Sequence, residues 1–122
     1  MASQCYRDLL VWQKAMDLVV DIYRLTEHFP KAEEFGLKAQ MRRAAVSVPS
    51  NIAEGQGRHR PKVFQEFLNI AMGSLSELET QIYLAVRLHL ISQQHGDALC
   101  SQCAEVGKMI YGLSNSITSR SH

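Results

Sequence analysis

Residues 61–90, PKVFQEFLNIAMGSLSELETQIYLAVRLHL, carry the clearest structural pattern in the chain. Their apolar side chains recur every three or four positions, which places them on one face of a helix. These positions are Phe64, Leu68, Ala71, Leu75, Leu78, Ile82 and Ala85. Pro61 suits the first position of a helix, because a backbone N–H is not needed there. The segment therefore predicts one helix over residues 61–90.

Residues 9–27, 35–56 and 92–118 repeat the same spacing on either side of this segment. The predicted buried face of the first is formed by Leu9, Trp12, Met16, Val19 and Tyr23. That of the second is formed by Leu37, Met41, Ala45, Val48 and Ile52. That of the third is formed by Leu99, Cys103, Val106, Ile110, Leu113 and Ile117. No strand-type alternation competes, so residues 1–122 predict a single all-α domain, an antiparallel up-down-up-down four-helix bundle.

Polar and small residues mark the ends and the close contacts of these predicted helices. Asp8 and Ser92 are placed to cap the helices that follow them, by accepting a hydrogen bond from a free backbone N–H. Gly73 and Gly107 lie inside helices, where glycine costs about 1 kcal/mol relative to alanine. We expect the close approach of a neighbouring helix to compensate at both glycines.

The composition is that of a folded domain without a membrane span. Hydrophobic residues make up 46% and charged residues 20% of the 122 residues, with a formal net charge of +1. These values exclude a disordered chain. Uncharged runs reach only about ten residues, well short of the roughly 18 that a membrane-spanning helix needs. Three cysteines and the lack of a secretion signal favour a reducing compartment, so we expect a cytoplasmic protein.

Three motifs go beyond generic helical patterning: DLLVWQKA at residues 8–15, RRAAVSVPSNIAEG at residues 42–55 and GSLSELE at residues 73–79. Together they closely resemble the 23S ribosomal RNA intervening-sequence protein family, also called four-helix bundle proteins. The resemblance covers about residues 6–117. It implies a left-handed antiparallel four-helix bundle that assembles into a ring-like homopentamer, and it implies little chemistry.

Members of this family are encoded within intervening sequences of ribosomal RNA genes, or stand as free genes of unknown function. A related branch comprises the accessory variability determinants of diversity-generating retroelements. The resemblance to that branch implies binding to nucleic acid and contact with a reverse transcriptase. That branch is basic, whereas this chain carries a net charge of only +1, so a nucleic-acid contact needs a local patch of charge.

Positive charge is concentrated between residues 38 and 62. Glu54 is the only acid in this segment, so its six cations give a local charge of +5. The cations are Lys38, Arg42, Arg43, Arg58, Arg60 and Lys62. Five copies in a ring would sum to a field that attracts nucleic acid. The alternative is ordinary pairing at i,i+4 within helices, as in Glu34–Lys38, Glu54–Arg58 and Lys62–Glu66.

Arg42 and Arg43 have no carboxylate three or four residues away. They are therefore predicted to pair with another helix, another subunit, solvent or a ligand phosphate. Their apolar flanks favour a buried or interfacial ion pair. Arg58, Arg60 and Lys62 lie at the connection between the second and third helices, where we expect exposed side chains that suit phosphate. All five are candidate nucleic-acid contacts.

Pro49 falls inside the second helix, where proline removes one hydrogen-bond donor and predicts a kink or break. Ser50, Asn51 and Glu54 follow closely, and Gly55 lies at the predicted end of the helix. A polar site is one interpretation of this group. A structural kink with local hydrogen bonding is favoured, because no histidine lies nearby to activate the serine hydroxyl.

The residue types needed for catalysis or metal binding are not found at the required spacings. Cys100 and Cys103, with His89 and His95, are zinc-type ligands, but no second ligand set accompanies them. Packing explains the cysteines better, because Cys103 falls on a predicted buried face. Neither a Glu-x-x-His pair nor a phosphate loop after a strand is present. We expect no enzyme, no metal and no cofactor.

The sequence favours two functions over a third and distant one, a small-molecule or metal binder with a pocket near Cys100 and Cys103. The first is a non-enzymatic oligomeric scaffold that binds RNA or DNA through its basic segment. The second is a protein–protein interaction module without nucleic-acid binding, whose basic residues form ion pairs between subunits.

Overall fold

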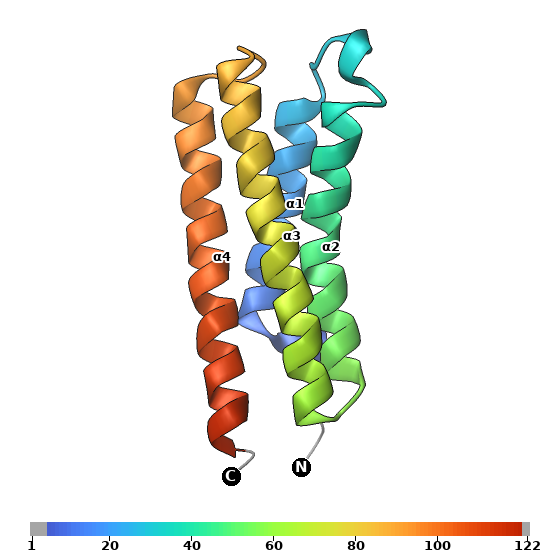
Figure 1. The fold of residues 1–122 in the computed structure, drawn as a ribbon, viewed down its shortest axis with the longest axis vertical. Coiled ribbons are helices and arrows are strands. Elements are labelled where there is room, and N and C mark those ends of the chain that lie inside the picture. The colour runs from blue at the N-terminus through green and yellow to red at the C-terminus, as the bar shows by residue number, and fades with distance from the viewer. Residues whose placement is uncertain (1–4, 121–122) are drawn as a thin grey trace.

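The computed structural model describes residues 5–120 and contains within them four α-helices, two short 3-10 turns and no strand (Figure 1). The helices are α1 (Leu10–Thr26), α2 (Leu37–Gly57), α3 (Pro61–Arg87) and α4 (Gln93–Arg120), and the turns are η1 (Tyr6–Asp8) and η2 (Lys31–Glu33). The predicted all-helical class with four helices is confirmed. The largest difference from a predicted helix end is three residues, at the end of α3. The left-handed up-down-up-down order stays a prediction.

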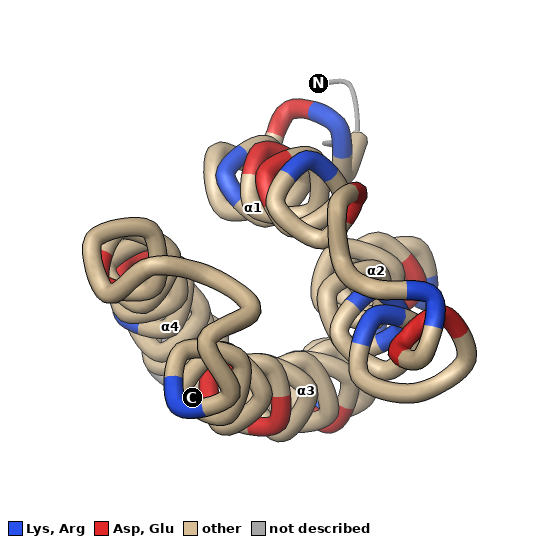
Figure 2. The backbone as a smooth tube through the Cα atoms, turned by 90° about the horizontal axis from the view of Figure 1, so that it is seen from above, with Lys and Arg blue, Asp and Glu red and all other residues tan. Residues whose placement is uncertain are grey.

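The four helices lie side by side and bury a common core. Seen end-on, they surround one centre in the order α1, α2, α3, α4 (Figure 2). Each helix contacts the one before it, and α4 also contacts α1. The largest fully buried side chains come from all four helices and include Leu18, Ile22, Met41, Ile52, Leu68, Leu78, Ile82, Leu99 and Ile110. None of the helices in the described residues combines the length and the apolar character needed to cross a membrane.

The buried face of α1 differs from the predicted one. Ala15, Leu18 and Ile22 are fully buried, whereas Met16 is 39% and Tyr23 is 41% exposed. From Met16 to Tyr23 the predicted buried positions each lie one residue after the observed ones, which corresponds to a rotation of about 100° around the helix, so the prediction is wrong here. The reason is that α1 carries two adjacent apolar stripes, and periodicity alone does not say which of them faces the core.

The second apolar stripe of α1 lines a groove against α2 on the outside of the bundle, which we call the α1–α2 groove. Its lining includes Trp12, Met16, Val19, Val46, Pro49 and Ser50. The rings of Tyr6 and Trp12 meet edge to face beside it, with their centroids 5.3 Å apart. The predicted face of α1 therefore packs at the rim of the bundle and leaves apolar surface open.

One of the two predicted caps is formed. The hydroxyl oxygen of Ser92 accepts a hydrogen bond from the N–H of His95 at 3.1 Å, which confirms the cap of α4. The cap of α1 by Asp8 is wrong, because Asp8 belongs to the turn η1 and the extended residue Leu9 precedes the helix. Among the described residues no side chain caps α1, and the side-chain amide of Gln13 donates to the carbonyl of Arg7 at 2.9 Å.

Close helix contacts occur at glycines other than the two expected. A Cβ at Gly55 would lie 2.6 Å from the Cβ of Phe67, and a Cβ at Gly96 would lie even closer to a side-chain atom of α3. A Cβ at Gly73 would meet no neighbouring helix of the described residues within 4 Å, and at Gly107 the nearest atom would be at 3.4 Å, an ordinary contact. The prediction is therefore wrong at both positions. The tight packing is found instead where side chains of α3 press on glycines of α2 and α4.

Candidate nucleic-acid interface

A connection of three residues, numbers 58–60, joins α2 to α3 at one end of the bundle. His59 has a left-handed backbone with a φ of 58°, which residues other than glycine adopt rarely. Arg60 is extended, and Pro61 follows as the first residue of α3, where its fixed φ suits a helix. The carbonyl of Arg60 accepts a hydrogen bond from the N–H of Phe64 at 2.8 Å. The chain thus reverses direction in a tight, defined turn.

Three exposed cations, Arg58, Arg60 and Lys62, lie on this connection and on the first turn of α3. We call them the cationic turn. Arg58 donates to Glu54 at 2.7 Å, which confirms the predicted i,i+4 pair. Arg60 and Lys62 form no ion pair with any described residue. The predicted pair between Lys62 and Glu66 is therefore wrong, in keeping with the few tenths of a kcal/mol that such an exposed pair contributes.

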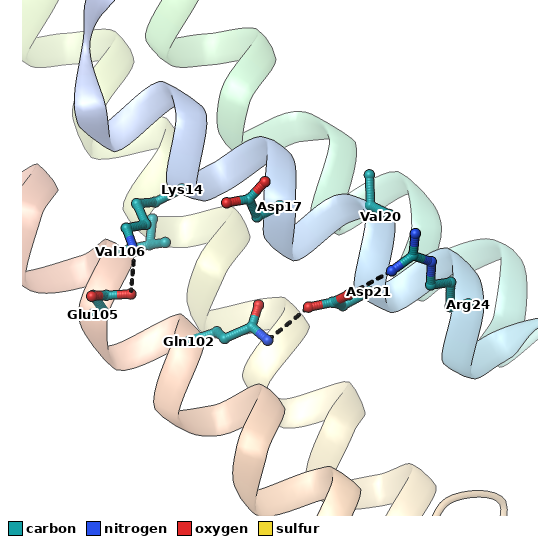
Figure 3. Close-up of a pocket in the computed structure, with 8 residues that line it drawn as sticks. All are labelled: Lys14, Asp17, Val20, Asp21, Arg24, Gln102, Glu105 and Val106. Atoms are coloured by element: carbon teal, nitrogen blue, oxygen red, sulfur yellow. Dashed lines mark hydrogen bonds and ion pairs between the residues drawn. The ribbon is translucent and has the colours of Figure 1, made fainter.

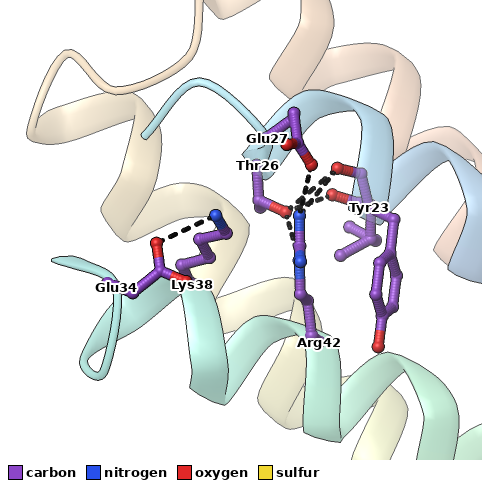
Figure 4. A network of polar contacts seen from close by, with 7 residues as sticks. Tyr23, Thr26, Glu27, Glu34, Lys38 and Arg42 are labelled. Carbon is purple, nitrogen blue, oxygen red and sulfur yellow. Dashed lines mark hydrogen bonds and ion pairs between the residues drawn. The ribbon is translucent and has the colours of Figure 1, made fainter. Parts of the chain in front are cut away.

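Arg42 lies between α2 and α1, and its guanidinium is held by partners within the chain (Figure 4). Its Nε donates to the hydroxyl of Thr26 at 2.9 Å. One terminal nitrogen donates to the carbonyl of Tyr23 at 3.1 Å and to the carboxylate of Glu27 at 3.3 Å. The guanidinium carbon also lies 4.2 Å from the centre of the Tyr23 ring. Of the partners that the sequence left open for Arg42, the structure shows another helix.

The neighbouring cations of α2 differ from Arg42 and from each other. Several Lys and Arg segments lie on this helix in the end-on view (Figure 2). Lys38 pairs with Glu34 at 3.1 Å, which confirms that prediction. Arg43 is exposed and forms no ion pair with any described residue. It lies 15 residues before Arg58 (58 minus 43), or about 22 Å along the helix axis, so the structure does not bring it into the cationic turn.

Pro49 is buried inside α2, and the helix continues from Leu37 to Gly57 without the predicted break. The side-chain amide of Asn51 donates to the carbonyl of Ser47 at 2.8 Å and to its hydroxyl at 2.9 Å. The two hydroxyls of Ser47 and Ser74 share a hydrogen bond of 2.7 Å, which links α2 to α3. The predicted local hydrogen bonding near the proline is therefore present, and the helix remains continuous through Pro49.

The rest of the group around Pro49 is spread over different surfaces. Ser50 is exposed at the α1–α2 groove, Glu54 pairs with Arg58, and Gly55 is buried against α3. These residues therefore do not share one polar site. Sequence reasoning missed Ser74 as a partner; its place in the GSLSELE motif was the available signal.

A family model with the description 23S rRNA-intervening sequence protein matches residues 7–112. The chain belongs to this family. A crystal structure of a protein of unknown function from the S23 ribosomal protein family of Bacteroides thetaiotaomicron is similar to this family member, with a TM-score of 0.77 and 23% sequence identity. The match covers 86% of this chain and 98% of that chain, and at this identity it shows the shared fold alone. No curated protein matches the chain.

The two cysteines of α4 are packing residues in this member of the 23S rRNA-intervening sequence family. Burial raises the pKa of the Cys103 thiol to about 12. Burial also raises the pKa of Cys100 above its ordinary value, against the opposing effect of a hydrogen bond with Tyr83. Both thiols keep their protons at neutral pH, which makes them poor nucleophiles. Among the residues the structure describes, no three metal-ligating side chains gather at one place.

A second groove of this protein lies between α1 and α4 and was not expected from the sequence (Figure 3). It has a volume of about 410 Å³ and is lined mainly by charged and polar side chains. Gln102 donates to Asp21 at 2.9 Å, Lys14 lies 3.9 Å from Glu105, and Arg24 lies 3.8 Å from Asp21. The first two of these contacts join the first helix to the last, whereas Arg24 and Asp21 both lie on α1. Four of the five charged residues of this groove are thus engaged in contacts with one another.

Proposed function

We propose that the chain, as a left-handed up-down-up-down bundle, is a non-enzymatic subunit of a ring-like homopentamer that binds RNA or DNA. The contact surface is the cationic turn, with Arg43 as a separate contact. The observation that carries the proposal is that Arg60 and Lys62 are exposed and form no ion pair with any described residue. Such cations can release counterions from phosphates, which is the main source of affinity for nucleic acid.

Repetition around a ring makes this charge effective. The three cations of the cationic turn face only Glu54, which leaves +2 on each chain (three minus one). At physiological salt a charge is screened beyond about 8 Å, so one copy attracts a polyanion weakly. Five copies would present +10 on one face of the ring and hold several phosphates at once. Self-assembly thus strengthens the binding of nucleic acid, because it brings several cationic turns onto one surface.

The α1–α2 groove supports self-assembly. Met16 and Val46 are each 39% exposed there, beside the half-buried ring of Trp12. Covering these apolar side chains with another apolar face is favourable, by about 25 cal/mol per Å². The family resemblance implies other copies of the chain as partners, and we assign this groove to that contact.

The test is a fluorescence-anisotropy titration of labelled single-stranded RNA, single-stranded DNA and duplex DNA at several salt concentrations. The variant replaces all of Arg58, Arg60 and Lys62 by alanine. The matched control replaces by alanine three exposed cations elsewhere that form no ion pair with described residues, Lys31, Arg87 and Lys108. Both variants lose three positive charges, so they differ only in where the charge is lost.

We expect the wild type to show a steep negative slope of log affinity against log salt. For each phosphate contact that the cationic-turn variant loses, the slope should become less negative by about 0.9 with duplex DNA and by about 0.7 with the single strands. The control should keep most of the slope. Equal slopes in the two variants would remove the cationic turn from the proposal, and the absence of binding at low salt would overturn it.

A protein-interaction module without nucleic-acid binding is the second candidate. It is favoured because Lys38 and Arg42, two of the six cations of the basic segment, already form ion pairs within the chain and are less available to phosphate. On this view Arg43 pairs with another subunit. Arg43→Ala would then dissociate the oligomer, as measured by light scattering after size-exclusion chromatography, without changing any nucleic-acid binding. An intact Arg43→Ala oligomer would leave this candidate without support.

A further inference from the structure

A pocket of about 420 Å³ opens directly beside the cationic turn, at the end of the bundle where the α2–α3 connection meets α4. We call it the end pocket. Its volume lies in the range of pockets that hold small organic groups. Its lining combines residues that are far apart in the sequence, from Leu9 through Phe64 to Ile117. The fold, rather than a local motif, builds this site.

One wall of the end pocket is apolar. It is formed by Leu9, Pro61, Phe64, Leu113 and Ile117. Leu9, Phe64 and Leu113 are only half-buried, so part of their surface remains in contact with water. Covering such surface with another apolar face is favourable, by about 25 cal/mol per Å². An aromatic ring among these side chains adds a surface on which a flat group can stack.

The rest of the lining of the end pocket is polar and positively charged. His59 and Ser116 line it with groups that can donate and accept hydrogen bonds. Arg60 lines it as well and forms no ion pair with any described residue. A matching ligand has an apolar flat face, a polar edge and a negative charge next to it. A nucleobase with its phosphate has all three.

We infer that the end pocket receives one unpaired base of a single-stranded nucleic acid, while a neighbouring phosphate lies on Arg60. The inference rests on the proposed function and adds the class of nucleic acid to it. A base within a duplex is paired and stacked on its neighbours, so it cannot enter the pocket without leaving the helix. The cationic turn alone binds single strands and duplexes through their phosphates, whereas the end pocket selects the single strand.

The α1–α2 and α1–α4 grooves lack this combination of properties. None of the described residues that line the α1–α2 groove is charged. The charged residues of the α1–α4 groove largely pair with one another, as in Lys14 with Glu105. The end pocket instead joins an apolar wall to a cation without an acidic partner, and it lies against the surface that the proposed function already uses.

The experiment compares two labelled single strands of equal length and charge, oligothymidylate and an abasic strand, with duplex DNA as a third probe. We expect the wild-type protein to bind oligothymidylate at least about fivefold more tightly than the abasic strand, since stacking of one base contributes at least this much. Ser116→Leu narrows the end pocket without changing charge and should abolish the difference. Ser101→Leu, at an exposed position of the same helix, is the matched control and should preserve it.

A second variant, Phe64→Leu, removes the aromatic ring while keeping an apolar side chain, and should also reduce the preference for oligothymidylate. Equal wild-type affinity for the oligothymidylate and abasic strands overturns this inference and leaves the proposed function intact, because both strands offer the same phosphates. A preference that survives in both Ser116→Leu and Phe64→Leu overturns it too, since the base then binds elsewhere. Failure of every probe to bind at low salt overturns the proposed function itself. The wild-type comparison needs no variant, so a poorly folded variant does not block the test.

Discussion

Replacing Arg42 by alanine tests how far the contact between α1 and α2 depends on one side chain. The guanidinium donates to the hydroxyl of the fully buried Thr26, to the carbonyl of Tyr23 and to Glu27, and it lies over the Tyr23 ring. The Arg42 side chain is only 20% exposed, whereas that of Glu27 is 66% exposed. The bonds to Thr26 and Tyr23 are therefore expected to matter more than the ion pair.

The magnitude follows from these contacts. Two hydrogen bonds at about 0.5–1.5 kcal/mol each, and a partly exposed cation–π contact at about 0.5–1 kcal/mol, give a loss of about 1.5–4 kcal/mol in unfolding free energy. The exposed carboxylate of Glu27 adds at most a few tenths of a kcal/mol. Arg42→Lys should recover little of the loss, because an ammonium group cannot reproduce the planar fork that reaches several acceptors.

The assay is urea denaturation followed by circular dichroism, with all proteins at one concentration because self-assembly contributes to apparent stability. Arg43→Ala is the control, since Arg43 is the next residue, carries the same charge and is exposed without an ion-pair partner among the described residues. It should change the unfolding free energy by less than about 0.5 kcal/mol. Equal losses for Arg42→Ala and Arg43→Ala would refute the reasoning, because the contacts of Arg42 would then carry no net energy.

Three further predictions concern packing, capping and pH. Gly55→Ala brings a Cβ to 2.6 Å from the Cβ of Phe67 and should lower the unfolding free energy by about 1–3 kcal/mol. Gly73→Ala places its Cβ in open space and should raise the unfolding free energy by about 0.5–1 kcal/mol. If urea denaturation shows changes of the same sign for both variants, the packing at Gly55 is contradicted. Ser92→Ala should cost about 1 kcal/mol by the same measurement, and no loss would mean that the cap of α4 is dispensable. Because folding raises the Cys103 pKa from 9.0 to about 12, its thiol stabilises the fold fully below pH 9, and this contribution falls as the pH rises toward 12. Cys103→Ala should flatten the decline of unfolding free energy over that range, and an unchanged slope would contradict the role of the thiol.

The sequence predicts the core face of a helix where one apolar stripe runs along its whole length. In α3 the positions from Leu68 to Ala85 in the predicted register are buried. No second stripe of that length is formed by the exposed apolar residues of α3, which are Ile70, Tyr83 and Leu84. In α1, residues such as Met16 and Tyr23 form a second stripe, and which stripe faces the core depends on how the other helices pack. That choice is a property of the assembled bundle and leaves no signal in a single helix.

The same distinction separates the charged contacts that could be predicted from those that could not. The pair of Arg58 with Glu54 lies within one helix at a spacing of four residues, so the sequence predicts it. The partners of Arg42 lie 15 to 19 residues away on another helix and leave no local pattern. The end pocket is harder still to predict from the sequence, because the residues that line it come from three separate parts of the chain.

Counting charges in a window of sequence therefore overstates the positive charge that is available to a ligand. The segment of residues 38–62 has a local charge of +5, but two of the acids that pair with its cations lie outside the window. The three pairs are Lys38–Glu34, Arg42–Glu27 and Arg58–Glu54. The cations that form no ion pair with described residues are Arg43, Arg60 and Lys62. Two of these three belong to the cationic turn beside the end pocket, so nucleic acid should be held at the end of each bundle. Each subunit should make at most about three phosphate contacts, and this number limits its share of the slope of log affinity against log salt.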